Sequence, residues 1–90
     1  MTFAVDFDGT VVTHNYPEVG KNIGAEIVLK KLAEKNHKIC LNTMRCDDKL
    51  DDAVQWFKDN DIELYGVNEN PSQKSWTSSP KVFADYYIDD

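Results

Sequence analysis

The stretch Phe3-Ala4-Val5-Asp6-Phe7-Asp8-Gly9-Thr10 decides the fold of this 90-residue chain. Its apolar residues suit a buried, pleated surface, so we expect a strand over residues 3 to 7. Because side chains alternate along an extended chain, Asp6 and Asp8 fall on the same side, about 7 Å apart at the backbone. Gly9 permits a sharp turn and a close approach of backbone to a ligand. We therefore predict a buried strand that ends in two neighbouring acids.

Helical and strand patterns alternate along the rest of the chain. Apolar residues at helical spacing predict an amphipathic helix that buries Ala25, Val28, Leu29, Leu32 and Ala33. Asn22 is the expected cap at its start and Asn36 at its end. Residues 38–42 predict a second strand, Asp47 and Asp48 begin a second helix, residues 63–67 predict a weaker strand, residues 68–80 a loop, and residues 85–88 a final strand.

This order of elements predicts the fold class. Strands that alternate with helices imply right-handed crossovers and a small, mainly parallel sheet. Ninety residues suffice for a single domain, which we expect to span residues 1–90. The prediction is an α/β domain, a Rossmann-like three-layer sandwich.

Composition and charge exclude several classes of protein. The formal net charge is −6 and no cluster of Lys and Arg is present, which argues against a nucleic-acid partner. No apolar run approaches the roughly 20 residues of a transmembrane helix, and strand-like residues follow Met1 at once, where a secretion signal has a basic region. We expect no membrane partner and a cytoplasmic location. Two cysteines are too few for a typical disulfide scaffold.

Polar residues follow three of the predicted strands at their carboxyl ends: Asp6, Thr43 and Asp89. In parallel sheets, ligands bind beyond these ends, so one pocket can collect all three. Two carboxylates about 5 Å apart repel by roughly 3 kcal/mol at an effective dielectric constant near 20. A hard cation such as Mg²⁺ would offset that repulsion. The alternatives are an Asp-Gly turn flanked by solvated acids, and a solvated acidic tail at Asp89 and Asp90.

Four motifs in order resemble the haloacid dehalogenase (HAD) superfamily over essentially the whole chain. They are Asp6-Phe7-Asp8-Gly9-Thr10, then Thr43 after an apolar strand, then Lys81, then Asp89-Asp90 after another apolar strand. The stretches 41–45 and 84–90 look in particular like small capless members of bacteria and phages. The first motif and the order of all four are the specific part of this resemblance.

The resemblance implies a Mg²⁺-dependent phosphomonoester hydrolase that acts on a small phosphorylated substrate. Asp6 would be the nucleophile that forms an aspartyl-phosphate, and Asp8 the acid and base that also lends its backbone carbonyl to the metal. Thr43 would bind a phosphoryl oxygen and Lys81 would neutralise charge. Asp89 would ligate Mg²⁺ with Asp90 beside it. This set suits phosphoryl transfer, which depends mostly on positioning and charge stabilisation.

Several assignments stay open on the sequence alone. Lys74 is the alternative to Lys81, because Lys81 lies only eight residues before Asp89 and its reach is tight. Arg45 is either a fork that binds the substrate's phosphate or carboxylate, or a surface residue at a helix start. We expect Gly9 and Thr10 to lie at the substrate. His14 is expected to be solvent-exposed rather than catalytic.

The gaps in which HAD members carry cap domains, residues 11–21 and 68–80, are too short for one. An open site suits either a bulky substrate or closure by another subunit in a homo-oligomer. Two other functions remain. A receiver-type phospho-acceptor module uses similar residues, but its acid pair comes first along the chain and here it comes last. The other is a non-catalytic phosphate- or metal-binding protein with an HAD fold.

Overall fold

The computed structural model describes residues 1–89 and contains an all-parallel sheet with two α-helices. The strands are β1 (Thr2–Val5), β2 (Lys38–Leu41), β3 (Gly66–Val67) and β4 (Tyr86–Ile88). Their order in the sheet is β3-β2-β1-β4. The helices are α1 (Ala25–Glu34) and α2 (Asp47–Asp59), and a short 3-10 helix, η1, spans Pro71–Ser75. This architecture is compatible with a Rossmann-like sandwich and bears out the predicted parallel α/β domain.

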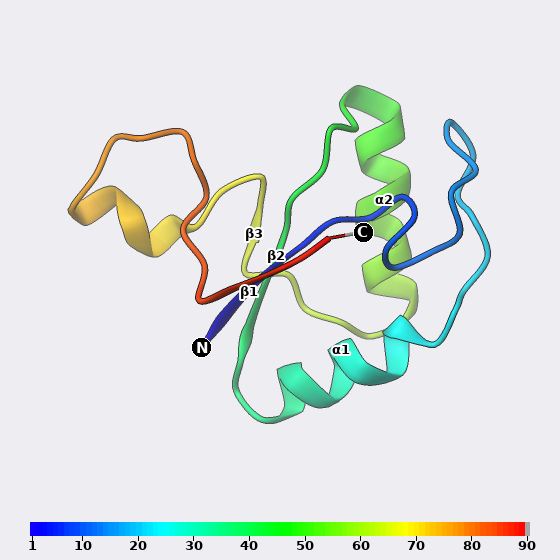
Figure 1. The fold of residues 1–90 in the computed structure, drawn as a ribbon, viewed down its shortest axis with the longest axis horizontal. Helices are drawn as coiled ribbons and strands as arrows, with labels where there is room; N and C mark the ends of the chain where they lie inside the picture. Colours follow the sequence, from blue (N-terminus) through cyan, green and yellow to red (C-terminus); the bar gives the residue numbers. More distant parts are fainter. Residues whose placement is uncertain (90) are drawn as a thin grey trace.

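The connections explain which elements cover which face. The crossovers from β1 to β2 and from β2 to β3 run in the same direction across the sheet, so right-handed connections place α1 and α2 on the same face (Figure 1). The next connection, residues 68–85, returns to the other side of β1 and lies away from the helices (Figure 1). The direction of winding therefore reverses between β1 and β4, which is where open parallel sheets bind ligands.

Each face of the sheet has its own apolar cluster. On the helical face, Val5 of β1 and Leu41 of β2 belong to the main core with Phe7 and with Phe57 of α2, all of them fully buried. On the other face, Ala4 and Cys40 are buried with Val82 and Ala84 of the 68–85 connection. The alternation of side chains along β1 and β2 thus supplies both layers of packing.

The strands keep the predicted places with shorter bounds. β1 and β2 pair from Thr2 with Lys38 to Val5 with Leu41, and β4 pairs with β1 from Phe3 with Tyr86 to Val5 with Ile88. The third strand is reduced to two residues, and the predicted loop contains η1. Buried Gln73 organises this loop, because its amide donates to the carbonyl oxygens of Ser79 and Lys81 and accepts from the backbone N–H of Phe83.

Two local predictions on α1 are wrong. Val28 is 57% exposed rather than buried, since Leu29 and the partly buried Ala25, Leu32 and Ala33 already meet the core. Asn22 does not cap the helix: Gly24 is the N-cap, and the Asn22 side chain accepts a hydrogen bond of 2.7 Å from the Trp56 indole. Asn36 does follow the helix end with a positive φ of 67°, as an αL residue at that place does.

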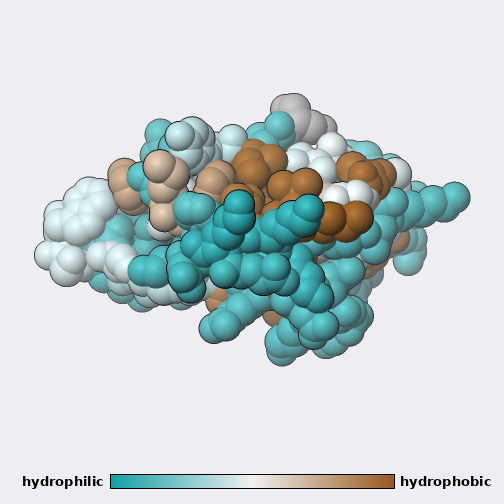
Figure 2. All heavy atoms as spheres, turned by 90° about the horizontal axis from the view of Figure 1, so that it is seen from below, coloured by the Kyte–Doolittle hydropathy of each residue, from teal (hydrophilic) through white to brown (hydrophobic). Residues whose placement is uncertain are grey.

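The exposed surface contains some apolar side chains. α1 lies at the bottom of Figure 1, and Figure 2 views the molecule from below, so the α1 side faces the reader. On this surface, hydrophobic atoms form a band that is bordered by hydrophilic ones. Ile27 and Val28 of α1 are among the large hydrophobic residues that remain exposed. Within residues 1–89, neither helix is long and apolar enough to cross a bilayer.

Candidate functional site

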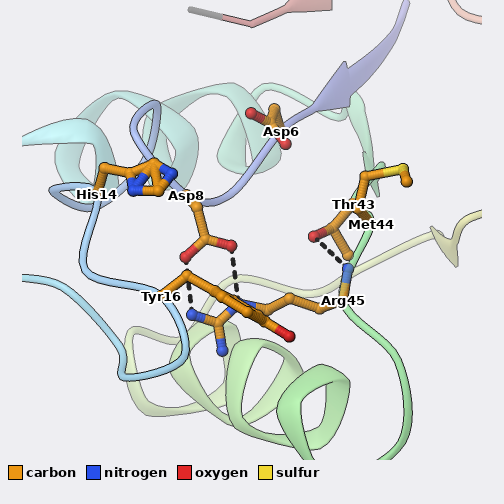
Figure 3. Close-up of a pocket in the computed structure, with 7 residues that line it drawn as sticks. All are labelled: Asp6, Asp8, His14, Tyr16, Thr43, Met44 and Arg45. Atoms are coloured by element: carbon orange, nitrogen blue, oxygen red, sulfur yellow. Dashed lines mark hydrogen bonds and ion pairs between the residues drawn. The ribbon is translucent and has the colours of Figure 1, made fainter.

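A cavity of about 480 Å³ opens at the carboxyl ends of β1 and β2 (Figure 3). Its walls come from the ends of these strands and from residues 13–21, which we call the flap. The lining residues are Asp6, Asp8, His14, Tyr16, Thr43, Met44 and Arg45. Of the three residues expected to share one pocket, Asp6 and Thr43 line this cavity together with Asp8, whereas Asp89 is not among its lining residues.

Asp6 directly follows β1, and its backbone continues the pairing of β1 with β4. Its N–H donates to the carbonyl oxygen of Ile88 over 2.9 Å. The Thr10 hydroxyl donates to Asp6 Oδ2 over 3.4 Å. Thr10 thus supports Asp6 and is not among the residues that line the cavity, which differs from its expected contact with substrate.

The pKa of Asp6 is raised above its usual value, chiefly because burial disfavours the charged carboxylate. A hydrogen bond from the backbone N–H of Phe7 lowers the pKa, while the negative charge of Asp89 and a side-chain hydrogen bond with it raise it further. The carboxyl groups of Asp6 and Asp89 therefore lie close enough to interact. The sequence predicted that these two acids, each at the carboxyl end of a strand, would lie close together.

Gly9 shapes the turn that follows β1. Its φ of 79° lies in the left-handed region that favours glycine, and its N–H donates to the carbonyl oxygen of Val12. The turn is closed by hydrogen bonds from the N–H groups of Thr10 and Val11 to the carbonyl oxygen of Phe7. Gly9 therefore serves the turn that aims Asp8, and it is not among the residues that line the cavity.

Arg45 binds the Asp8 carboxylate in a bidentate ion pair (Figure 3). Arg45 Nε donates to Asp8 Oδ2 over 2.8 Å and Nη2 donates to Oδ1 over 2.7 Å. The Arg45 side chain is only 1% exposed, and Asp8 is 16% exposed. Hydrogen bonding to Asp8 raises the pKa of the guanidinium, so Arg45 remains a cation. The pair fixes the orientation of the Asp8 carboxylate.

The remaining donors of Arg45 are also used. Its guanidinium donates to the carbonyl oxygens of Pro17 and Glu18 in the flap and of Lys49 in α2. This corrects both sequence-based interpretations of Arg45, because a buried side chain with these partners is neither a surface residue nor a fork open to substrate. Arg45 instead ties Asp8, the flap and α2 together.

Thr43 follows β2 and its hydroxyl lines the cavity. The hydroxyl oxygen accepts from the backbone N–H of Arg45 over 3.2 Å, so its own proton remains available to donate. The backbone N–H of Thr43 donates to Asn68 Oδ1 over 2.8 Å. Our sequence reasoning missed Asn68, although a polar residue directly after the third predicted strand was a usable signal.

Both candidate lysines lie outside this cavity. Lys74 is paired with Glu69, with Nζ and Oε1 3.0 Å apart. Lys81 is exposed and lines a separate pocket with Tyr87, on the face of the sheet opposite the helices. Within residues 1–89, the ammonium group of Lys81 makes no hydrogen bond or ion pair. The structure thus brings neither lysine to the Asp6 cavity. Of the two, Lys81 lies nearer to β4, because its pocket includes Tyr87 of that strand.

The remaining cavity residues come from the flap and from the segment after β2. His14 is exposed, as expected, and it also lines the cavity. Tyr16 and Met44 line it as well, and our sequence reasoning named neither. Tyr16 lies in an irregular segment without a periodic or motif signal, and Met44 lies within the stretch 41–45 that carries the family resemblance.

The carboxylates at the sheet edge are the groups that a divalent cation would meet. Within residues 1–89, no three His, Cys, Asp or Glu side chains form a metal-binding group. The Asp8 carboxylate faces Arg45, whereas Asp6 and Asp89 face each other. The two close carboxylates of Asp6 and Asp89 are hard oxygen donors of the kind that Mg²⁺ accepts, so their chemistry fits such an ion. Asp90 lies outside the described residues.

The fold and site together define an α/β protein with an acidic cavity at the carboxyl edge of a parallel sheet. Among solved structures, the chain is similar to a conserved protein coded by a locus of Bacteroides thetaiotaomicron, with 40% sequence identity and a TM-score of 0.91. The match covers 100% of this chain and 75% of that one. This chain belongs to the same family as that conserved protein. No protein-family model and no curated protein matches the sequence.

Proposed function

We propose that this protein is a capless, Mg²⁺-dependent phosphomonoester hydrolase of the HAD type, with Asp6 as its nucleophile. The observation that carries the proposal is the position of Asp6, at the end of a central strand, beside Asp89 and across the cavity from the Thr43 hydroxyl. A carboxylate in this place, two residues before a second and firmly oriented one, suits covalent catalysis of phosphoryl transfer.

The chain's own residues account for both chemical steps. In the first, a carboxylate oxygen of Asp6 forms a bond to phosphorus while the ester oxygen leaves, and Asp8 gives that oxygen a proton. In the second, Asp8 takes a proton from water, whose oxygen bonds to phosphorus as the Asp6–phosphorus bond breaks. The Thr43 hydroxyl donates to a phosphoryl oxygen. The Thr10 hydroxyl, which donates to Asp6 Oδ2, helps to orient the nucleophile.

Mg²⁺, held by Asp6, Asp89 and the Asp8 backbone carbonyl, would supply positive charge next to the transferring phosphoryl group. Asp90 is a further candidate ligand. Lys81 is the better candidate for the additional cation, because Lys74 is already paired with Glu69. The ammonium of Lys81 would have to extend past β4 from its pocket to the Asp89 end of the strand.

Two observations favour a second function, that of a non-catalytic phosphate- or metal-binding protein. Neither lysine lines the cavity, and the Asp8 carboxylate is engaged by Arg45. Catalysis would require Asp8 to exchange a proton with the substrate, and both of its carboxylate oxygens already accept hydrogen bonds from Arg45. A binding protein needs no such proton transfer, so turnover is the property that separates the two functions.

The test is hydrolysis of para-nitrophenyl phosphate with Mg²⁺ by wild type, Asp6→Asn and the control Asp51→Asn, which alters an exposed acid on α2. We expect steady turnover by wild type and by the control, and its loss in Asp6→Asn, because an amide cannot act as the nucleophile. Turnover above a few per cent of wild type in Asp6→Asn would remove Asp6 from this role. No turnover by wild type, together with tight Mg²⁺ binding, would favour the binding protein.

A further inference from the structure

The backbone of the flap is fixed to the side of the cavity on which Asp8 and Arg45 lie. Thr13 and Lys21 close its base, because the N–H of Thr13 donates to the carbonyl oxygen of Lys21 and the N–H of Lys21 donates to Thr13 Oγ1. Its tip is held by Arg45, which donates to the Glu18 carbonyl oxygen over 2.7 Å. A buried cation therefore sets the position of the flap relative to Asp8.

Tyr16 of the flap gains an ordered position from the same cation. Its ring lies over the Arg45 guanidinium, with 5.1 Å between the guanidinium carbon and the ring centroid (Figure 3). The residue is nevertheless 54% exposed and lines the cavity. An aromatic ring that is already held in place loses little conformational freedom when it contacts a ligand, which makes it an effective recognition surface.

Met44 adds a second apolar wall. It follows Thr43 on the β2 side of the cavity, away from Tyr16 (Figure 3). It is 99% exposed, so it contributes nothing to the core. Thioethers make favourable contacts with aromatic rings. The cavity thus has polar groups at the sheet edge and two exposed apolar side chains at its sides.

The chemistry of the proposed reaction says which part of a substrate meets Tyr16. Asp8 would protonate the leaving oxygen, so the leaving group must lie next to Asp8. Tyr16 lies over the guanidinium that binds Asp8. The leaving group and the Tyr16 ring therefore occupy the same part of the cavity.

We propose that Tyr16 determines specificity and that the substrate's leaving group carries a flat unsaturated ring, which stacks on Tyr16 and contacts Met44. This inference rests on the proposed phosphatase function. The ring would be an aryl group or a nucleobase, and both offer the same flat π-face. The cavity volume of about 480 Å³ leaves room for such a group beyond the phosphate.

The first experiment measures binding, so that it does not depend on turnover. Dissociation constants of benzylphosphonate and ethylphosphonate are determined with Mg²⁺ for wild type, Tyr16→Leu, Met44→Ala and the control Tyr86→Leu. Tyr86 is similarly exposed, at 52%, but lies on β4 outside the cavity. These phosphonates lack an ester oxygen and are not hydrolysed. We expect benzylphosphonate to bind wild type about ten-fold more tightly, a typical effect of one stacking contact.

We expect Tyr16→Leu to reduce this ratio to about three-fold or less, and Tyr86→Leu to leave it unchanged. Met44→Ala, at a residue outside the core, should lower the ratio without affecting folding, which keeps the test decisive if Tyr16→Leu is unstable. Equal affinities for the two phosphonates in wild type, no binding of either, or an unchanged ratio in both Tyr16→Leu and Met44→Ala would overturn the proposal.

The second experiment measures kcat/KM for two matched pairs, benzyl phosphate with ethyl phosphate and a nucleoside 5′-monophosphate with ribose 5-phosphate. Preference within the first pair alone assigns an aryl substrate, and preference within the second assigns a nucleotide. Turnover of both pairs without a ring preference would overturn this inference and leave the proposed phosphatase standing. Ring-selective binding without any turnover would support Tyr16 as the contact and remove the phosphatase.

Discussion

Arg45 shows how one residue connects the parts of the site. It reaches across 37 positions of sequence to bind Asp8, and it also holds the flap and α2. Its ring contacts, with Phe7 on the core side and Tyr16 on the cavity side, each have the guanidinium carbon 5.1 Å from a ring centroid. Arg45 is therefore a positioning residue, which would act on the proposed reaction through Asp8.

Replacing Arg45 by Lys should weaken both stability and turnover. Lysine keeps the positive charge but has no fork with which to bind both oxygens of Asp8. We expect the free energy of unfolding to fall by about 3 kcal/mol, since disrupting a buried ion pair leaves the other charge poorly compensated. Urea denaturation and kcat measure the two effects. The control Lys58→Ala, at an exposed cation of α2, should change stability by less than about 0.5 kcal/mol.

Asp6 should make stability depend on pH. Because the folded-state pKa of Asp6 lies above its ordinary value of 3.8, the folded chain binds more protons than the unfolded chain between those two values. Stability is therefore lost as pH rises through this window. Without metal, Asp6→Asn should be more stable than wild type at pH 7, and the difference should shrink as pH falls towards 3.8. Thermal melts in EDTA across this range measure it. A difference that is independent of pH would contradict the assignment.

At the scale of elements, the connection from β3 to β4 decides where the lysines lie. Gln73 in η1 is buried and binds the carbonyl oxygens of Ser79 and Lys81. Asn70 donates to the carbonyl oxygen of Phe83 over 2.9 Å. These side chains give an ordered path to a segment that its Ser, Asn and Pro content marks as a loop. The path covers the sheet face opposite the helices and sets the backbone position of Lys81.

Lys81→Ala should reduce kcat far more than Lys74→Ala. The Lys74 ammonium is occupied by Glu69, whereas Lys81 shares a pocket with Tyr87, two residues before Asp89. A lysine that neutralises charge in the transition state lowers kcat when it is removed, whereas a change in KM alone indicates a loss of uniform binding. Steady-state kinetics of the two variants compare them directly. The opposite ranking would assign the role to Lys74.

At the scale of the whole molecule, the acids at the sheet edge should couple metal binding to stability. Repulsion between Asp6 and Asp89 opposes folding without metal, and a divalent cation would relieve it. Mg²⁺ at about 100 times its dissociation constant should stabilise the fold by about 2.7 kcal/mol. For a domain of this size, that corresponds to a rise in melting temperature on the order of 10 °C or more.

Asp89→Asn should have two opposite effects on the same measurement. The melting temperature in EDTA should rise, because one of two interacting negative charges is removed, and the shift on adding Mg²⁺ should shrink, because a ligand is lost. Thermal melts of both proteins with EDTA and with Mg²⁺ show both changes. Equal Mg²⁺-induced shifts in the two proteins would remove Asp89 from the metal site.

The sequence by itself determined the parallel α/β organisation and the positions of Asp6, Asp8 and Thr43 at the carboxyl edge. These features follow from local patterns: alternation in β1, helical spacing in α2, and polar residues directly after apolar strands. The meeting of Asp6 with Asp89 was also predictable, because parallel strands align their carboxyl ends. Val28 shows the limit of this reasoning, since its helical spacing is correct and the core beneath it is already filled.

Only the tertiary structure decided which partners these residues have. The burial of Arg45 depends on neighbouring α2 and on Asp8 and the flap, which come from a distant part of the chain. The Tyr16 ring has its place because Arg45 is there, and Lys81 lies on the far face because Gln73 fixes the connection. A sequence pattern reports the few residues on either side of a position, whereas a pocket is assembled from contacts between segments that only folding brings together.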